Sequence, residues 1–212
     1  MAFENVTLYY FTIAGAKSTL ALGENLNLFL KDAGIDFKYV RVTGDEFKES
    51  DVKKNLLAQK HYSTTLPAVE IDGQFYNKVV PTMRYLSKKL GKYMGKNDQE
   101  DYFLDTVADI RGDYLFGWLK TIRETDEVKL KEHVETVTKK YLGILNEFYG
   151  RHQGPYVLGD EITYPDFLVY HIIDDDKALG LLEDYPNLQQ FVNTFTQRPN
   201  LVDYFASLKE SN

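Results

Sequence analysis

Cysteine is missing from the 212-residue chain. Its absence excludes disulfides, thiolate metal sites and a cysteine nucleophile that belongs to the protein itself. Any thiol chemistry would therefore have to come from a ligand. Basic residues are in the minority, with 25 Lys and Arg against 32 Asp and Glu, which gives a net charge of −7. This balance argues against nucleic acid or an anionic membrane as the main partner, because both attract basic surfaces.

Long hydrophobic runs are absent as well. No uninterrupted apolar stretch approaches the roughly 18 residues of a membrane helix. The first residues, MAFENVTLYYF, have neither the basic flank nor the apolar core of a signal peptide. We therefore expect a cytoplasmic protein without a membrane partner. Hydrophobic residues make up 43% of the chain and charged residues 27%, which is ordinary for one large globular domain or two modest ones.

Strand and helix patterns alternate along the first 90 residues. Apolar runs rich in β-branched and aromatic side chains indicate strands, and Asp72-Gly73 is a strong hairpin turn signal. A loop over residues 12–19, with Gly15 as its one glycine, follows the first strand. In chain order the sequence predicts a strand at 6–11, a helix at 20–33, a strand at 37–42, a weak charged helix at 45–60, strands at 66–71 and 74–76, and a helix at 81–90.

Strand signals nearly vanish beyond a polar stretch at residues 91–99. Helical periodicity continues over 100–121, 128–149, 164–173, 188–194 and 201–208. One of these helices has a well-marked start, because Thr163 and Asp166 can form a capping box around Pro165. We interpret that box as a folding device. The sequence thus predicts an α/β domain at 1–90, a linker at 91–99 and an all-helical domain at 100–212.

Three segments carry a resemblance to a known family: Leu66-Pro67 before the hairpin, TYPDFLVY at 163–170 and RPNLVDYFASL at 198–208. In this combination the chain resembles the cytosolic glutathione transferases over nearly its whole length. The resemblance implies a fold of class α/β plus all-α, with a thioredoxin-like βαβ-ββα domain followed by a C-terminal helical bundle. Within this family the chain most resembles the sigma-like, tyrosine-type branch. The resemblance rests on Tyr10-Phe11 at the end of the first strand and on Asp105, Asp109 and Asp113 in the second domain.

The resemblance implies that a hydroxyl activates the thiol of glutathione. A free thiol has a pKa of about 8.5, so only a few per cent is thiolate at neutral pH. A hydroxyl that donates a hydrogen bond to sulfur favours the charged form. Tyr10 is the predicted donor, because it lies at a strand end where loops meet ligands. Ser18 and Thr19 are the alternatives, since other branches use a serine near the first helix. The loop after Tyr10 is longer than in sigma-like relatives, and it lacks their arginine; Lys17 is its nearest cation.

Pro67 is expected to follow a cis peptide bond, which costs X–Pro pairs only about 0.5–1 kcal/mol. That geometry would let the backbone of Leu66 pair with the cysteinyl part of glutathione like an added strand. An ordinary edge-strand proline is the alternative. Thr65 stands where the family usually has glutamine. Asp109 could face the ammonium group of the ligand across a dimer interface, or it could be an ordinary solvated acid.

Lys78-Val79 departs from the family pattern just before the helix at 81–90. The family places an acid or amide and then a serine there, and the serine binds the γ-glutamyl carboxylate at the helix N-terminus. Proline is tolerated only in the first helical turn, so Pro81 fixes the helix start nearby. Val79 is then predicted to be the N-cap, for which valine is poorly suited. Either the Lys78 ammonium replaces the lost hydroxyl, or the glutathione site has decayed.

The sequence therefore predicts a glutathione transferase that activates the glutathione thiolate for attack on small apolar electrophiles. Conjugation, peroxide reduction and isomerisation are all within this class, with glutathione as cosubstrate. We expect a homodimer, as the resemblance implies, and no metal. The rival hypothesis is a non-catalytic binding or scaffold protein with a degenerate glutathione site.

Overall fold

The computed structural model describes residues 3–13 and 17–210 of the chain. Contacts divide the chain into two compact units. One is formed by the residues up to Leu90 together with those from Pro199 onward, and the other is Gly91–Arg198. The closing helix thus groups with the first unit, whereas the sequence analysis counted it with the second domain. The domain limits themselves stay a prediction, because units defined by contacts need not be units of folding.

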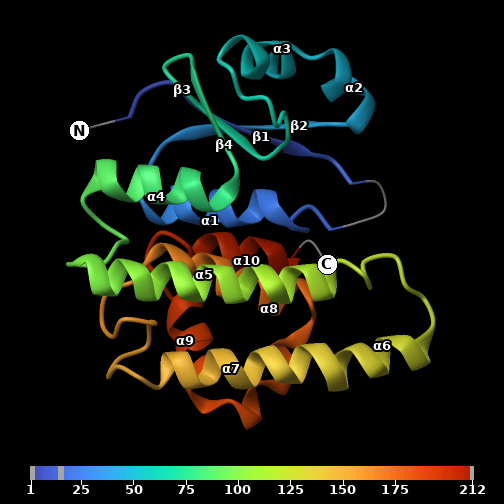
Figure 1. Cartoon of the computed structure of the whole chain (residues 1–212), viewed down its shortest axis with the longest axis vertical. Coiled ribbons are helices and arrows are strands. Elements are labelled where there is room, and N and C mark those ends of the chain that lie inside the picture. Colours follow the sequence, from blue (N-terminus) through green and yellow to red (C-terminus); the bar gives the residue numbers. More distant parts are fainter. Residues whose placement is uncertain (1–2, 14–16, 211–212) are drawn as a thin grey trace. The chain divides into compact units, whose positions relative to one another are not determined.

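A four-stranded sheet forms the centre of the first unit (Figure 1). Its strands are β1 (Val6–Phe11), β2 (Phe37–Val42), β3 (Ala68–Ile71) and β4 (Gln74–Asn77), in the spatial order β2-β1-β3-β4. β1 pairs in parallel with β2 and antiparallel with β3, and β3 pairs antiparallel with β4. The strand prediction is confirmed, except that β3 begins at residue 68 and not at 66. Pro67 has no N–H to offer to the ladder.

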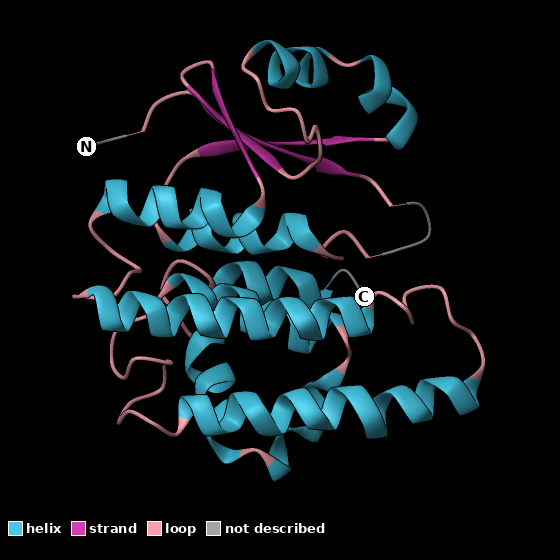
Figure 2. Ribbon diagram, viewed as in Figure 1, coloured by secondary structure: helices cyan, strands magenta, loops and turns pink. Residues whose placement is uncertain are grey.

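Helices cover both faces of this sheet (Figures 1 and 2). α1 (Leu22–Asp32) and α4 (Val79–Leu90) lie on one face, and the short helices α2 (Gly44–Glu49) and α3 (Asp51–Ala58) lie on the other. Ser50 follows α2 and caps α3 by accepting from the Lys53 N–H, which divides the helix predicted over 45–60. α10 (Val202–Glu210) completes the unit, and its Tyr204 hydroxyl donates to buried Glu24 of α1 at 2.7 Å.

The core of the first unit includes one side of β1 and most of α1. Every second residue of β1 is buried, and the last of this inward set is Tyr10. α1 begins at Leu22, two residues later than predicted, because Ala21 has φ 62° and ψ −156° and so cannot belong to the helix. Residues 14–16 of the preceding loop, Gly15 among them, lie outside the described residues.

The second unit is built from helices (Figure 2). In chain order these are α5 (Asp98–Trp118), α6 (Glu127–His133), the π-helical turn η1 (Val134–Thr138), α7 (Lys139–Tyr149), α8 (Tyr164–Asp175), the 3-10 helix η2 (Ala178–Asp184) and α9 (Pro186–Thr196). The helix predicted over 128–149 is confirmed as one continuous helical run from Glu127 to Tyr149 that contains the π-helical turn η1. The 3-10 helix η2 was not predicted. No helix in the described part of the chain is both long and apolar enough to span a membrane.

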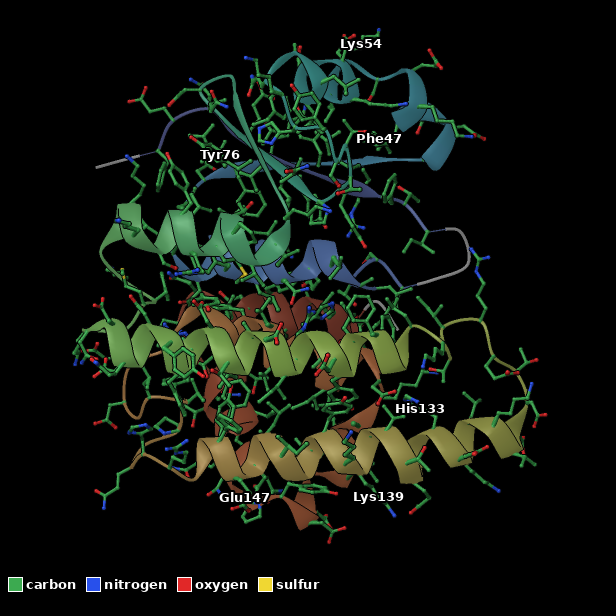
Figure 3. All side chains as sticks on the ribbon, in the orientation of Figure 1. Phe47, Lys54, Tyr76, His133, Lys139 and Glu147 are labelled. Carbon is green, nitrogen blue, oxygen red and sulfur yellow. The ribbon has the colours of Figure 1, made fainter. Side chains whose placement is uncertain are left out.

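A buried carboxylate explains where α6 gives way to α7. Asp176 accepts from the hydroxyls of Tyr114 and Thr138 at 2.6 Å each. It also lies 2.8 Å from Nε2 of His133, which Figure 3 labels at the end of α6. Two of these residues belong to or adjoin η1, so Asp176 fixes the chain where the helical pattern changes.

The predicted capping box at the start of α8 is present. The N–H and the hydroxyl of Thr163 donate to Asp166 at 2.7 and 2.8 Å. The same carboxylate accepts from the Tyr149 hydroxyl at 2.8 Å and from the Val157 N–H at 3.1 Å. Burial raises the pKa of Asp166 to about 6, although these four donors favour its charged form.

Candidate functional site

Residues from four separate segments form one row across an edge of the sheet. Tyr10 of β1 pairs with Arg41 of β2. The β1–β3 and β3–β4 ladders both end at Ala68. If the same register continued for one more residue, Pro67 would lie beside Tyr10, and Lys78 would lie beside Pro67. The loops that follow β1, β2 and β4 meet the segment before β3 at this edge. Such edges are where α/β sheets bind ligands.

Tyr10 packs against the N-terminus of α1. It is 5% exposed, and its hydroxyl oxygen accepts from the Leu22 N–H at 3.1 Å. Gly23 makes this approach possible, because a Cβ there would lie 2.3 Å from Cδ1 of the Tyr10 ring. A hydroxyl that accepts one hydrogen bond becomes a better donor of another. The helix N-terminus also favours negative charge close by. Tyr10 is thus arranged to donate its hydrogen to an anionic atom.

Arg41 supplies a cation beside Tyr10 that the sequence analysis missed. Its guanidinium carbon lies 5.6 Å from the centre of the Tyr10 ring and 4.4 Å from the centre of the Tyr39 ring. Nη1 donates to the Phe11 carbonyl at 2.9 Å, and Nη2 donates to the Ser18 carbonyl. No local motif marks this role, because Arg41 reaches Tyr10 through the pairing of two strands that a whole helix separates in the sequence.

A groove of about 740 Å³ in the first unit reaches Arg41. It runs between α1, β2 and α10, and Lys31, Tyr39 and Tyr204 also line it. Lys31 Nζ lies 4.7 Å from the centre of the Tyr204 ring. Burial raises the pKa of the Tyr39 hydroxyl, so this phenol is neutral at ordinary pH.

The predicted cis bond between Leu66 and Pro67 is confirmed. Leu66 is 6% exposed, while the side chain of Thr65 is exposed. Asn77 Nδ2 donates to the Ser63 carbonyl at 2.7 Å, which ties the segment before the cis bond to the end of β4. The paired part of β3 begins two residues after Leu66. The Leu66 backbone therefore extends past the ladder, as an added strand would require.

The start of α4 differs from the prediction for Val79. Val79 is the first helical residue and not the N-cap. Lys78 holds the cap position, with φ 68°, and its carbonyl accepts from the Thr82 N–H at 3.1 Å. The helix can begin this early because Pro81 still lies in its first turn, where no N–H is needed. Lys78 is exposed and Val79 is 7% exposed. A lysine thus occupies the cap position of a helix whose first N–H groups lack partners within the helix.

The other candidate residues do not belong to the row of Arg41, Tyr10, Pro67 and Lys78. Ser18 is exposed, and Thr19 next to it is 7% exposed. Asp109 belongs to the second unit, where it is an exposed residue of α5. The first unit thus gathers the predicted ligand residues of β1, β3 and α4 at one edge, and Asp109 is not part of that unit.

One group in the second unit has the composition of a metal site. Among the described residues, His171, Asp174 and Asp175 can place one ligand atom each within 4.8 Å of one another. His171 Nε2 lies 3.1 Å from Asp175 Oδ2. Burial lowers the pKa of Arg111 to about 10, and the Asp175 carboxylate opposes that fall. Because the positive charge of Arg111 already interacts with the Asp175 carboxylate, we interpret the group as a buried ionic cluster.

Known proteins similar in sequence share one family name. The family profile described as "Glutathione S-transferase, C-terminal domain" matches residues 108–208. Glutathione S-transferase P 10 of Caenorhabditis elegans is 30% identical over 208 residues, which cover 95% of this chain and 91% of that protein. A glutathione S-transferase of Anopheles gambiae is 29% identical over 206 residues, 94% of each chain.

A solved structure shows the same fold. The Pi-class glutathione S-transferase of Onchocerca volvulus superposes with a TM-score of 0.81 at 22% identity, over 98% of this chain and 95% of that one. The predicted fold class, a thioredoxin-like part followed by a helical part, is therefore confirmed. The similarity to the C. elegans protein extends over nearly the full length of both chains. On that similarity, the chain belongs to the glutathione S-transferase family.

Proposed function

We propose that this protein transfers glutathione to small apolar electrophiles and that Tyr10 holds the reacting thiolate. Family membership favours this enzymatic role over the hypothesis of a non-catalytic scaffold. The observation that carries the assignment to Tyr10 is its hydroxyl, which accepts from the Leu22 N–H at the start of α1. Ser18 and Thr19 have no comparable position in the row formed by Tyr10, Pro67 and Lys78.

The chemistry asked of Tyr10 is the stabilisation of a charge. The glutathione thiol loses its proton to solvent, and the Tyr10 hydroxyl keeps its own hydrogen and donates it to the sulfur anion. A lone pair of the sulfur then forms a bond to a carbon of the acceptor. The bond from that carbon to the leaving group breaks, and the leaving group takes the electron pair. Each unit by which the thiol pKa falls is worth about 1.4 kcal/mol. A fall of about two units from about 8.5 makes most of the bound thiol nucleophilic at neutral pH.

Backbone and charge contacts would hold the rest of the tripeptide. The Leu66 backbone, which lies beyond the paired part of β3, pairs with the cysteinyl residue, and Thr65 adjoins it. The γ-glutamyl carboxylate lies at the start of α4, bound by the Val79 N–H and by the Lys78 ammonium. An ammonium–carboxylate hydrogen bond is stronger than the bond from a neutral hydroxyl. In this proposal Lys78 replaces the serine of the family, and the site has not decayed.

Substitution of Tyr10 tests the assignment. Tyr10→Phe should lower kcat/KM with a chloroaromatic acceptor by about 100-fold, the loss typical for one preorganised donor. Retention on immobilised glutathione should survive, since Leu66 and Lys78 remain. Tyr9→Phe is the matched control, because the Tyr9 hydroxyl donates to Glu70 at 2.8 Å and has no part in the site. Equal activity of the two variants would refute the role of Tyr10.

Calorimetry with reduced glutathione tests the role of Lys78. Lys78→Ala should weaken binding by about tenfold or more, because a charged hydrogen bond contributes about 1.5–3 kcal/mol. Lys88→Ala removes an exposed ammonium from the other end of α4 and serves as the control. If both variants bind as the wild type does, Lys78 has no part in holding the carboxylate.

We also propose a homodimer of the sigma-like, tyrosine-type branch, in which Asp109 faces the ammonium group of glutathione. Tyr10 supports the branch, since a tyrosine donor defines it. Light scattering should give twice the mass of the 24.5 kDa chain. Asp109→Asn should then weaken glutathione binding without changing that mass. A monomer that binds glutathione fully would contradict the shared site.

A further inference from the structure

Two carbonyl oxygens at opposite ends of one loop accept from a single guanidinium. Phe11 is the last residue of β1, directly after Tyr10, and Ser18 lies shortly before α1. Through Nη1 and Nη2, Arg41 joins the strand that carries Tyr10 to the segment that leads into α1. The first N–H of α1, from Leu22, is the one that contacts the Tyr10 hydroxyl. Arginine offers such a planar fork of donors, and lysine does not.

Arg41 forms no ion pair with an acid among the described residues, and the acid that acts on the same Tyr39 hydroxyl is buried Glu24 of α1. The contacts of Arg41 among these residues are the two carbonyl oxygens and the faces of the Tyr10 and Tyr39 rings. Arg41 also lines the groove between α1, β2 and α10, so its charge is not enclosed by protein on all sides. A nearby cation favours the anionic form of an ionisable group. An anion that accepts from Tyr10 would experience this charge.

We infer that Arg41 is a positioning residue for the thiolate site: it fixes Tyr10 against the start of α1 and adds a positive charge beside it. The inference rests on the proposed role of Tyr10 as the thiolate donor. It assigns to β2 a part in the reaction. Arg41 itself does not touch the substrate.

The experiment compares three variants of the full chain: Arg41→Met, Arg41→Lys and Lys31→Met. Lys31 is the control, because its ammonium also lies over a tyrosine ring in the same groove but contacts Tyr204 and not Tyr10. Calorimetry first establishes that the wild type binds reduced glutathione. The ultraviolet thiolate band of the bound ligand is then titrated, and kcat/KM is measured across pH.

Arg41→Met should raise the pKa of the bound thiol by about one unit and lower kcat/KM by about tenfold below that pKa, with little change in glutathione affinity at pH values where the bound thiol is protonated. Arg41→Lys keeps the charge and should recover part of the pKa shift. Lys31→Met should match the wild type. A merely structural role would lower the melting temperature of Arg41→Met and leave the pH profile in place, which would overturn the inference.

Hydrogen exchange gives a readout that needs no glutathione. The Leu22 amide should exchange about fivefold faster or more in both Arg41 variants, relative to the Leu26 amide in the same helix. Unchanged protection of Leu22 would overturn the positioning role. If the wild type gives no heat with glutathione, the proposed function fails on its own, whereas wild-type binding with an unmoved thiol pKa in Arg41→Met refutes only the role of Arg41.

Discussion

Replacing Ala21 by glycine should stabilise the protein, which is the opposite of the usual effect of glycine. Ala21 stands directly before α1 with φ 62° and ψ −156°. Glycine occupies this region of backbone conformation readily, and residues with a side chain avoid it. The conformation is retained because it lets the next residue, Leu22, direct its N–H at the Tyr10 hydroxyl. The strain therefore lies at the proposed catalytic site.

The expected gain follows from three contributions. Holding a residue with a side chain in such a region costs about 1–3 kcal/mol, and glycine removes that cost. Glycine adds about 0.4–1 kcal/mol of chain entropy to the unfolded state. Ala21 is 7% exposed, so losing its buried methyl group costs up to about 0.8 kcal/mol more. With the middle of each range, the net change in the free energy of unfolding is a gain of about 0.5 kcal/mol, a rise of about 1–2 °C in Tm for a chain of this length.

Urea denaturation of wild type, Ala21→Gly and Ala33→Gly measures this change. Ala33 lies at the other end of α1 with φ −68°, a conformation that alanine adopts without strain. Glycine at residue 33 should therefore lower the free energy of unfolding by about 0.5–1 kcal/mol. If Ala21→Gly destabilises the protein as much as Ala33→Gly does, Ala21 is not strained and the reasoning fails.

Two further predictions concern a close approach and a buried acid. Gly23→Ala should lower both stability and conjugation activity, because the new Cβ would meet the Tyr10 ring at 2.3 Å. Gly143→Ala in α7 has open space around it and should instead stabilise the protein by up to about 1 kcal/mol. Equal effects of the two substitutions on stability would contradict the close contact. Burial raises the pKa of Asp166 to about 6, against about 3.9 in an unfolded chain, so the folded state binds this proton more tightly. The stabilisation from this proton is complete below about pH 4 and is lost, up to about 3 kcal/mol, as pH rises through 6. Asp166→Asn should abolish that part of the pH dependence in urea titrations from pH 4 to 7. An identical dependence of stability on pH in both proteins would rule out this role of Asp166.

Features that depend on neighbouring residues could be predicted from the sequence. The turn at Asp72-Gly73 and the capping box of Thr163 and Asp166 each depend on a few adjacent residues. The local sequence was therefore sufficient to predict both features. The cis bond at Pro67 and the donor at Tyr10 came from resemblance to a family, and the donor role still awaits its test.

Features that depend on distant contacts could not be predicted. The π-helical turn η1 within the helix of residues 127–149 lies where Asp176, far along the chain, binds His133 and Thr138. Lys78 became the cap of α4 because the β3–β4 ladder ends one residue before it, and no propensity favours lysine there. Arg41 lies opposite Tyr10 only through the register of two parallel strands.

The loop after Tyr10, which the resemblance predicts to be longer than in sigma-like relatives, and the position of Arg41 are parts of one arrangement. A longer loop costs more conformational entropy to close, although each doubling of its length adds only about 0.6 kcal/mol. The greater difficulty is precision, since a longer loop by itself fixes the start of α1 less firmly against β1. Arg41 binds the carbonyls of Phe11 and Ser18, the two ends of that loop, and so restores the fixed geometry from a neighbouring strand. Changes in the length of residues 12–17 should therefore be tolerated while Arg41 is present, and should abolish conjugation in Arg41→Met.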